Sequence, residues 1–220
     1  MIPVALAPEP AEFDAKVRQP GLSAIDELVG RRPRRPRPGP RRSQVATSES
    51  KIPADAFPPY WREALDDMML AYEQRCAYLA MFIEHTGHPT VDHVVPKSYA
   101  WDKVYEWSNY RLCTGIVNSK KLELRGLVDP VHAKVGWFAL DLTSYHVVRG
   151  AAAPRAAHAK IDKTLPLLNL RDCLAQRRRY VEDYRLGPGN KGIDLSYLER
   201  RAPFIAAELR RQGQLVRGDV

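Results

Sequence analysis

Apolar residues recur at helical spacing from Trp61 onward, and acidic residues occupy the first turns of this segment. Because residues three and four apart share one face of a helix, the pattern predicts a helix that ends near Arg75. An apolar stretch follows, and we interpret residues 81–84 and 90–95 as two strands of a hairpin. Residues 90–95 are rich in β-branched side chains, and Pro96 ends the run.

A loop of mostly polar and aromatic residues separates residues 90–95 from a second short apolar run at 110–113. The residues after this run have the pattern of a helix start, and Asn118 lies within them. The stretch 90–121 is therefore expected to form a strand, a loop, a strand and a helix, in that order.

Strand character returns within residues 126–149, where apolar runs at 137–140 and 145–148 predict a second hairpin. The fold class that follows is α+β, mostly helical, with small antiparallel pieces. Three helices are expected near the C-terminus: 154 to about 168, 171–186, and one from a cap at Asp194 or Ser196 to about 212.

Residues 1 to about 56 contain many prolines and few aromatic side chains, and residues 31–42 read RRPRRPRPGPRR. Prolines lack a backbone donor and like charges repel, so no packed element is expected there. We expect residues 1–56 to form a disordered, Arg/Pro-rich arm and residues 57–220 to form the folded domain. Two interpretations of the arm stay open: a solvated tail, or a segment that lies along phosphates or in a minor groove.

The formal net charge of +8 is concentrated in this arm. Residues 31–42 carry +7, whereas residues 1–30 carry −3 and residues 43–220 carry +4. The balance favours a polyanionic partner. No apolar run is long enough to span a membrane, the N-terminus lacks the basic region of a signal peptide, and the three cysteines form no disulfide framework. We therefore expect a cytoplasmic protein.

Phosphodiester hydrolysis requires charge stabilisation and an activated water. The stretch 90–121 contains residue types that can supply both. Asp92 is a hard oxygen ligand suited to Mg²⁺ or Mn²⁺, and Asn118 can add a carbonyl oxygen to the same ion. A neutral imidazole at His93, with a reference pKa of about 6.5, can accept a proton from water. Its other nitrogen needs an acceptor, which we expect to be a carbonyl of the loop 96–108. Asn109 is expected to tie this loop down and so to fix the imidazole.

Residues 76–121 resemble the HNH endonucleases, also called the ββα-metal or His-Me finger group. The resemblance lies in V-D-H-V-V-P-K-S, then W-S-N-Y-R-L, then V-N-S-K-K. It is closest to the Asp-His…Asn…Asn version in the HNH domain of RNA-guided CRISPR nucleases. The resemblance implies a ββα-metal finger at about 76–122, with Asp92 and Asn118 as metal ligands, His93 as general base and Asn109 as the residue that positions the loop.

Many HNH proteins flank this motif with two Cys-x-x-Cys pairs that bind a structural zinc. Here the corresponding positions read C-A-Y-L from Cys76 and C-T-G-I from Cys113, so one cysteine of each pair is present. Two thiolates cannot close a tetrahedral site, and no structural zinc is expected. We expect the second hairpin and the C-terminal helices to brace the finger instead, with Cys76 and Cys113 as buried neighbours.

Lys97, Lys120 and Lys121 are candidates for phosphate contacts, although exposed lysines also serve solubility alone. The resemblance implies a metal-dependent endonuclease acting on DNA, with RNA not excluded. It also suggests an effector of a bacterial phage-defence system, with an ATPase or sensor protein as partner. The alternative is a nuclease-derived module that binds nucleic acid or protein without turnover.

Overall fold

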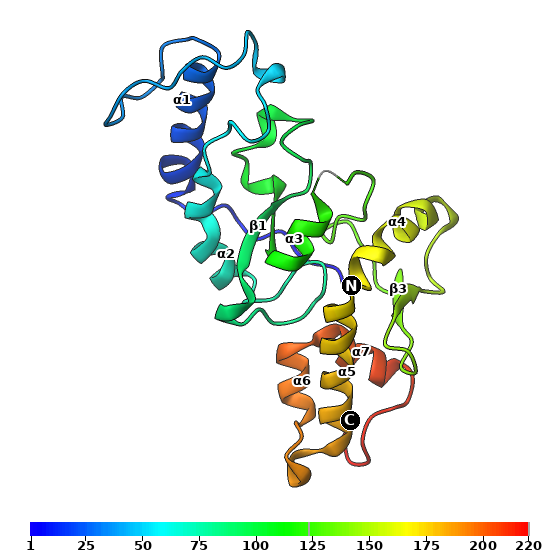
Figure 1. Cartoon of the computed structure of the whole chain (residues 1–220). Helices are drawn as coiled ribbons and strands as arrows, with labels where there is room; N and C mark the ends of the chain where they lie inside the picture. Colours follow the sequence, from blue (N-terminus) through cyan, green and yellow to red (C-terminus); the bar gives the residue numbers. More distant parts are fainter. Residues whose placement is uncertain (123, 220) are drawn as a thin grey trace. The chain divides into compact units, whose positions relative to one another are not determined.

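The computed structural model describes residues 1–122 and 124–219, without the side chain of His85. The chain forms two compact units (Figure 1). The central unit comprises Leu6–Gln74 and His88–Arg125, and the C-terminal unit comprises Met1–Ala5, Arg75–Gly87 and Gly126–Val220. The architecture is mixed α and β, as predicted, with two small antiparallel sheets. Among the described residues, no helix has the length and apolar character needed to cross a bilayer.

The N-terminal segment of the central unit is helical, which corrects the prediction that residues 1–56 are disordered. A π-helical turn at Asp14–Arg18 leads into α1 (Gln19–Leu28). Phe13, Val17 and Ile25 are buried, and their spacings of four and eight residues place them on one face, which is the amphipathic pattern of a helix. Apolar burial of this face outweighs the low aromatic content on which the prediction of disorder relied. The boundary predicted at residue 56 is also wrong, because residues 6–74 belong to one unit with 88–125.

Residues 31–42 form no helix or strand, but four of their seven arginines are paired with acidic side chains. Asp26 binds Arg31 and Arg34, with nitrogen–oxygen distances of 3.0 Å in both pairs. Glu27, which is buried, binds Arg37 at 3.1 Å and Arg42 at 2.8 Å. These two carboxylates therefore offset part of the positive charge of this stretch within the chain. The paired arginines are Arg31, Arg34, Arg37 and Arg42.

Strand β1 (Pro89–His93) pairs antiparallel with β2 (Tyr110–Thr114), and α3 (Gly115–Lys121) follows β2 directly. The register places Asp92 opposite Arg111 and His93 opposite Tyr110. The hairpin predicted between residues 81–84 and 90–95 is therefore wrong. β2 is almost entirely buried, and its apolar side chains decide the partner of β1 more strongly than the turn-like residues that precede β1.

A short helix before β1 supports both β1 and β2. The chain forms a 3₁₀ helix at Tyr60–Ala64 and then α2 (Leu65–Ala71), which contacts β1 and β2. Helix α2 ends earlier than predicted, because Glu73 and Gln74 adopt left-handed backbone conformations. The other described 3₁₀ turns are Glu49–Lys51, His85–Gly87, Trp101–Lys103, Trp107–Asn109, Arg155–Ala157 and Pro188–Asn190.

The C-terminal unit contains the predicted second hairpin, in which β3 (Phe138–Leu140) pairs antiparallel with β4 (Val147–Arg149). Helices α4 (His158–Leu168) and α5 (Arg171–Leu186) also agree with the sequence pattern. The last predicted helix is divided into α6 (Leu195–Arg201) and α7 (Pro203–Arg211), since Pro203 cannot continue the hydrogen-bond pattern of a helix. Asp194 caps α6 as predicted, by accepting a hydrogen bond of 2.7 Å from the backbone N–H of Tyr197.

Candidate active site

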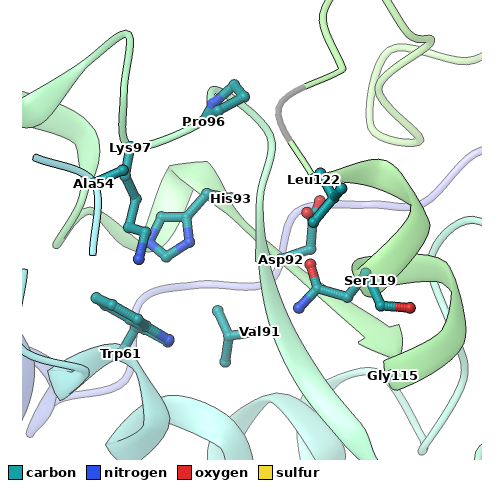
Figure 2. Close-up of a pocket in the computed structure, with 11 residues that line it drawn as sticks. Ala54, Trp61, Val91, Asp92, His93, Pro96, Lys97, Gly115, Ser119 and Leu122 are labelled. Carbon is teal, nitrogen blue, oxygen red and sulfur yellow. The ribbon is translucent and has the colours of Figure 1, made fainter.

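The end of β1 and the start of α3 border a pocket with a volume of about 430 Å³ (Figure 2). Successive side chains of a strand point to opposite faces, and Figure 2 shows Asp92 and His93 on opposite sides of the strand. Both nevertheless line the pocket. The predicted site residues that line it are Asp92, His93, Lys97 and Asn118.

The buried imidazole of His93 is held by the backbone carbonyl of Val104, with 2.9 Å between Nε2 and the oxygen. The hydroxyl of Tyr110 donates to the same oxygen at 2.8 Å. A carbonyl oxygen only accepts, so Nε2 carries the ring proton and Nδ1 is the acceptor nitrogen. The prediction that a carbonyl of the loop 96–108 holds the imidazole is confirmed by this contact.

Burial keeps His93 neutral. Desolvation is the largest cause that lowers its pKa, to about 4, and the positive charges of Lys97 and Lys121 act in the same direction. The Val104 carbonyl opposes these effects but does not outweigh them. The ring packs edge-on against Trp61 and Tyr110, with centroid distances of 5.0 and 5.1 Å. At neutral pH the imidazole is therefore an unprotonated base in a fixed orientation.

Asn109 ties the two ends of the loop together. Its Oδ1 accepts from the backbone N–H of Val95 at 2.8 Å, and its Nδ2 donates to the carbonyls of Val95 and Lys103 at 3.1 and 3.0 Å. The side chain is buried, so these bonds have no competition from water. Lys103 precedes Val104, and Asn109 thereby fixes the carbonyl that holds His93. These contacts are the ones predicted for a residue that positions the loop.

The N-terminal segment braces the same loop from outside. Arg18 donates from Nε to Glu106 at 3.1 Å, and the indole Nε1 of Trp107 donates to the carbonyl of Ala7 at 2.7 Å. Phe13 packs edge-on against Trp107 with 5.6 Å between ring centroids. Sequence reasoning missed these residues, although the buried spacing from Phe13 through α1 was a signal that could have found them.

Asn118 has an amide oxygen suited to bind a cation. Its Nδ2 donates to Thr90 Oγ1 at 2.6 Å, so the atom left to act as a ligand is Oδ1. Helix α3 carries this side chain into the pocket lined by Asp92. The structure thus brings the two predicted metal ligands to one pocket.

The three predicted phosphate-binding lysines occupy different environments. Lys97 lines the pocket with its ammonium 4.3 Å from the centre of the Trp61 ring, and burial lowers the pKa of its amine. Lys120 is exposed on α3. Lys121 is 2% exposed, and its ammonium lies 3.0 Å from Asp92 Oδ1. Lys121 is therefore not a solvated surface lysine, and its contact with a phosphate stays a prediction.

Asp92 and Asn118 offer oxygen donors, the kind that hard cations prefer. Among the described side chains, which leave out His85, no group of three or more His, Cys, Asp or Glu is arranged to hold a metal. Mg²⁺ is commonly bound by one or two carboxylates with several waters and substrate phosphate oxygens, and Mn²⁺ accepts similar ligands. Asp92 and the Asn118 oxygen match that pattern.

The two cysteines compared with zinc ligands are both buried. Cys113 lies in the central unit and Cys76 in the C-terminal unit. The second hairpin and the C-terminal helices, which were expected to brace the finger, also belong to the C-terminal unit. Within the central unit, the segment of residues 60–71 contacts β1 and β2.

The chain has no match among protein-family models, curated proteins or solved structures. Its function must therefore be inferred from the contacts of the site and from the motifs in residues 76–121. The strand–strand–helix order of β1, β2 and α3 is the frame on which these contacts are built.

Proposed function

We propose that this protein is a metal-dependent HNH endonuclease with a ββα-metal finger, which hydrolyses phosphodiester bonds in DNA. The observation that carries the proposal is the fixed tautomer of His93. The Val104 carbonyl holds Nε2–H, which leaves Nδ1 as a proton acceptor in a residue that lines the same pocket as Asp92 and Asn118. A general base beside two oxygen ligands is the minimum set for metal-assisted hydrolysis.

Each side chain has a separate task in this proposal. Asp92 and Oδ1 of Asn118 hold a Mg²⁺ or Mn²⁺ ion, which when bound supplies electrostatic stabilisation of the leaving oxygen. His93 Nδ1 removes a proton from the attacking water, and the Val104 carbonyl keeps the ring from rotating. Asn109 acts only on the loop and is a positioning residue.

The proposed substrate and partners follow from the resemblance and from charge. We propose that Lys97, which lines the pocket, and Lys120, which is exposed on α3, contact the phosphates of DNA, with RNA as a second substrate class. We also propose a cytoplasmic role as the effector of a bacterial phage-defence system, with an ATPase or sensor protein as partner.

One observation favours the alternative, a nuclease-derived module that binds nucleic acid or protein without turnover. The carboxylate of Asp92 is already paired with the ammonium of Lys121. A permanent ion pair at this position would replace the metal and leave His93 without its electrophilic partner.

Plasmid nicking by the purified protein in Mg²⁺ or Mn²⁺ tests the proposal. We expect His93→Ala to abolish nicking and His132→Ala, a change at an exposed histidine, to leave it unchanged. Nicking that survives in His93→Ala would remove His93 as the base. A wild-type protein that binds plasmid but never nicks it with either ion would support the binding module.

A further inference from the structure

Lys121 connects α3 to both residues at the end of β1. Its ammonium lies 3.0 Å from Asp92 Oδ1 and donates a hydrogen bond of 2.7 Å to the backbone carbonyl of His93. Lys121 and Asp92 are 2% and 3% exposed, so water does not screen the ion pair between them. Asn118, the second proposed ligand, lies one helical turn before Lys121 on the same helix.

This lysine places a positive charge beside the carboxylate that the proposed cation needs. A divalent ion bound to Asp92 would lie close to the Lys121 ammonium in a poorly screened environment, where like charges repel strongly. The ion must therefore either displace the ammonium or bind against its charge. Both routes weaken binding of the ion to the protein alone.

A phosphodiester group changes this balance. It brings one negative charge into the pocket and offers oxygens that complete the coordination of a hydrated Mg²⁺ or Mn²⁺ ion. The ammonium of Lys121 and the ion are then balanced by two anions, the Asp92 carboxylate and the phosphate, and no longer compete for the carboxylate alone. By linkage, an ion that binds better with nucleic acid also makes nucleic acid bind better.

We propose that Lys121 is a built-in counter-ion of Asp92 that makes binding of the divalent ion depend on the substrate phosphate. This inference rests on the proposed metal-dependent function of the same site. Lys121 is thus a positioning residue: it joins α3 to β1 and limits loading of the metal in the absence of nucleic acid.

The first test measures the affinity for Mn²⁺ of the full chain by electron paramagnetic resonance of the free ion. We expect Lys121→Met, which keeps most of the side-chain volume without the charge, to bind Mn²⁺ at least about tenfold more tightly than wild type. The control, Lys120→Met, removes an exposed lysine from the same turn and should match wild type. Equal or weaker binding by Lys121→Met, with measurable binding by wild type, would overturn the role of Lys121.

The second test retains Lys121, because its removal leaves the buried Asp92 carboxylate without this partner and lowers stability. In the non-cleaving His93→Asn variant, we expect Mn²⁺ to bind at least about fivefold more tightly with a saturating DNA duplex than without it. Mn²⁺ bound by the duplex alone is measured in parallel and subtracted. Equal affinity in both conditions would overturn the inference and leave the proposed nuclease function intact.

A third outcome concerns the proposed function itself. If wild type, Lys121→Met and the non-cleaving variant with DNA all fail to bind Mn²⁺, the site holds no divalent ion. That result overturns the proposal of a metal-dependent nuclease together with the proposed role of Lys121.

Discussion

Gly21 on α1 faces the ring of Tyr105 so closely that a Cβ atom at position 21 would lie 2.3 Å from two of the ring carbons. Tyr105 is the neighbour of Val104, whose carbonyl holds His93, and its own hydroxyl donates to the carbonyl of Pro58 at 2.8 Å. The close approach of α1 therefore determines where this part of the loop lies. We therefore expect the N-terminal helix to position the proposed base through Tyr105.

Gly21→Ala should consequently disturb the site from a distance. The added methyl group must push the tyrosine ring or α1 away, and we expect a loss of about 1–3 kcal/mol in the free energy of unfolding, as for other overpacked positions. Nicking should also slow, because the Val104 carbonyl moves with the loop. Urea denaturation and plasmid assays measure the two effects.

Gly189→Ala is the matched control for this change, because no atom lies within 4 Å of its added Cβ. We expect its stability and nicking rate to stay near those of wild type. Equal effects of Gly21→Ala and Gly189→Ala would show that the contact between α1 and Tyr105 does not hold the loop.

His93 should make the stability of the protein depend on pH below 6.5. The folded imidazole has its pKa lowered to about 4 by burial, whereas the unfolded imidazole keeps a pKa of about 6.5. Between these values the unfolded chain binds a proton that the folded chain does not, so acid favours unfolding. From this group alone, we expect the free energy of unfolding to fall by up to about 1.4 kcal/mol per pH unit from 6.5 toward 4, and to be constant above 6.5.

The comparison of wild type with His93→Asn isolates this contribution. Asparagine can donate a hydrogen bond as Nε2 does but does not titrate, so the slope between pH 4 and 6.5 should be shallower in the variant. Urea titrations at several pH values, without added divalent ions, measure both slopes. Identical slopes would mean that the folded imidazole titrates like an exposed one.

Asn109 offers a test of the loop that leaves the base itself unchanged. Asn109→Asp keeps the acceptor for the N–H of Val95 but loses both bonds to the carbonyls of Val95 and Lys103 and places a carboxylate against them. We expect the free energy of unfolding to fall by about 1–3 kcal/mol, because the part-buried carbonyls lose their donor and face a carboxylate. Nicking should decrease as well, since Lys103 adjoins Val104.

The control for charge and composition is Asn190→Asp. Asn190 is exposed and donates one bond of 3.2 Å to the carbonyl of Leu186, so its loss should change stability by less than about 0.5 kcal/mol. Denaturation of both variants in parallel separates the loop contact from a general effect of added negative charge. Comparable losses in the two variants would contradict a special role for Asn109.

The contacts that sequence reasoning predicted are short-range ones. Asn109 and the carbonyl of Val104 hold residues that lie 14 and 11 positions away in the chain, and the motif of residues 90–121 includes both partners of each bond. Such contacts follow from residue type and order. The pocket shared by Asp92 and Asn118 follows similarly from a strand, a loop, a strand and a helix in sequence.

The contacts that were missed connect distant parts of the chain. Trp107 donates to the carbonyl of Ala7, and Arg18 binds Glu106, so each pair joins the loop to the N-terminus. Neither partner carries a pattern that identifies the other. The burial of Lys121 was missed for another reason: a lysine in the last turn of a helix is usually solvated, and only the position of Asp92 draws it inward.

The effect of residues 31–42 on the stability of the central unit is separable from the effect of their charge on nucleic-acid binding. Deleting residues 1–50 would remove Phe13 and the rest of the buried face of α1, and we expect the central unit to unfold. A charge-only change is a sharper test of nucleic-acid binding. The residues to alter are those that are exposed and form no ion pair within residues 1–122 and 124–219: Arg32, Arg35 and Arg41.

Replacement of these three arginines by glutamine should leave stability within about 0.5 kcal/mol of wild type, because no ion pair is lost. If the stretch lies along DNA, the slope of log affinity against log salt should become shallower by about 0.9 for each arginine that contacts a phosphate. Binding titrations at several salt concentrations measure the slope. The control is the same charge change on Arg178, Arg179 and Arg185, which are exposed on α5. If both triple variants change the salt slope equally, residues 31–42 contribute only through the net charge of the protein.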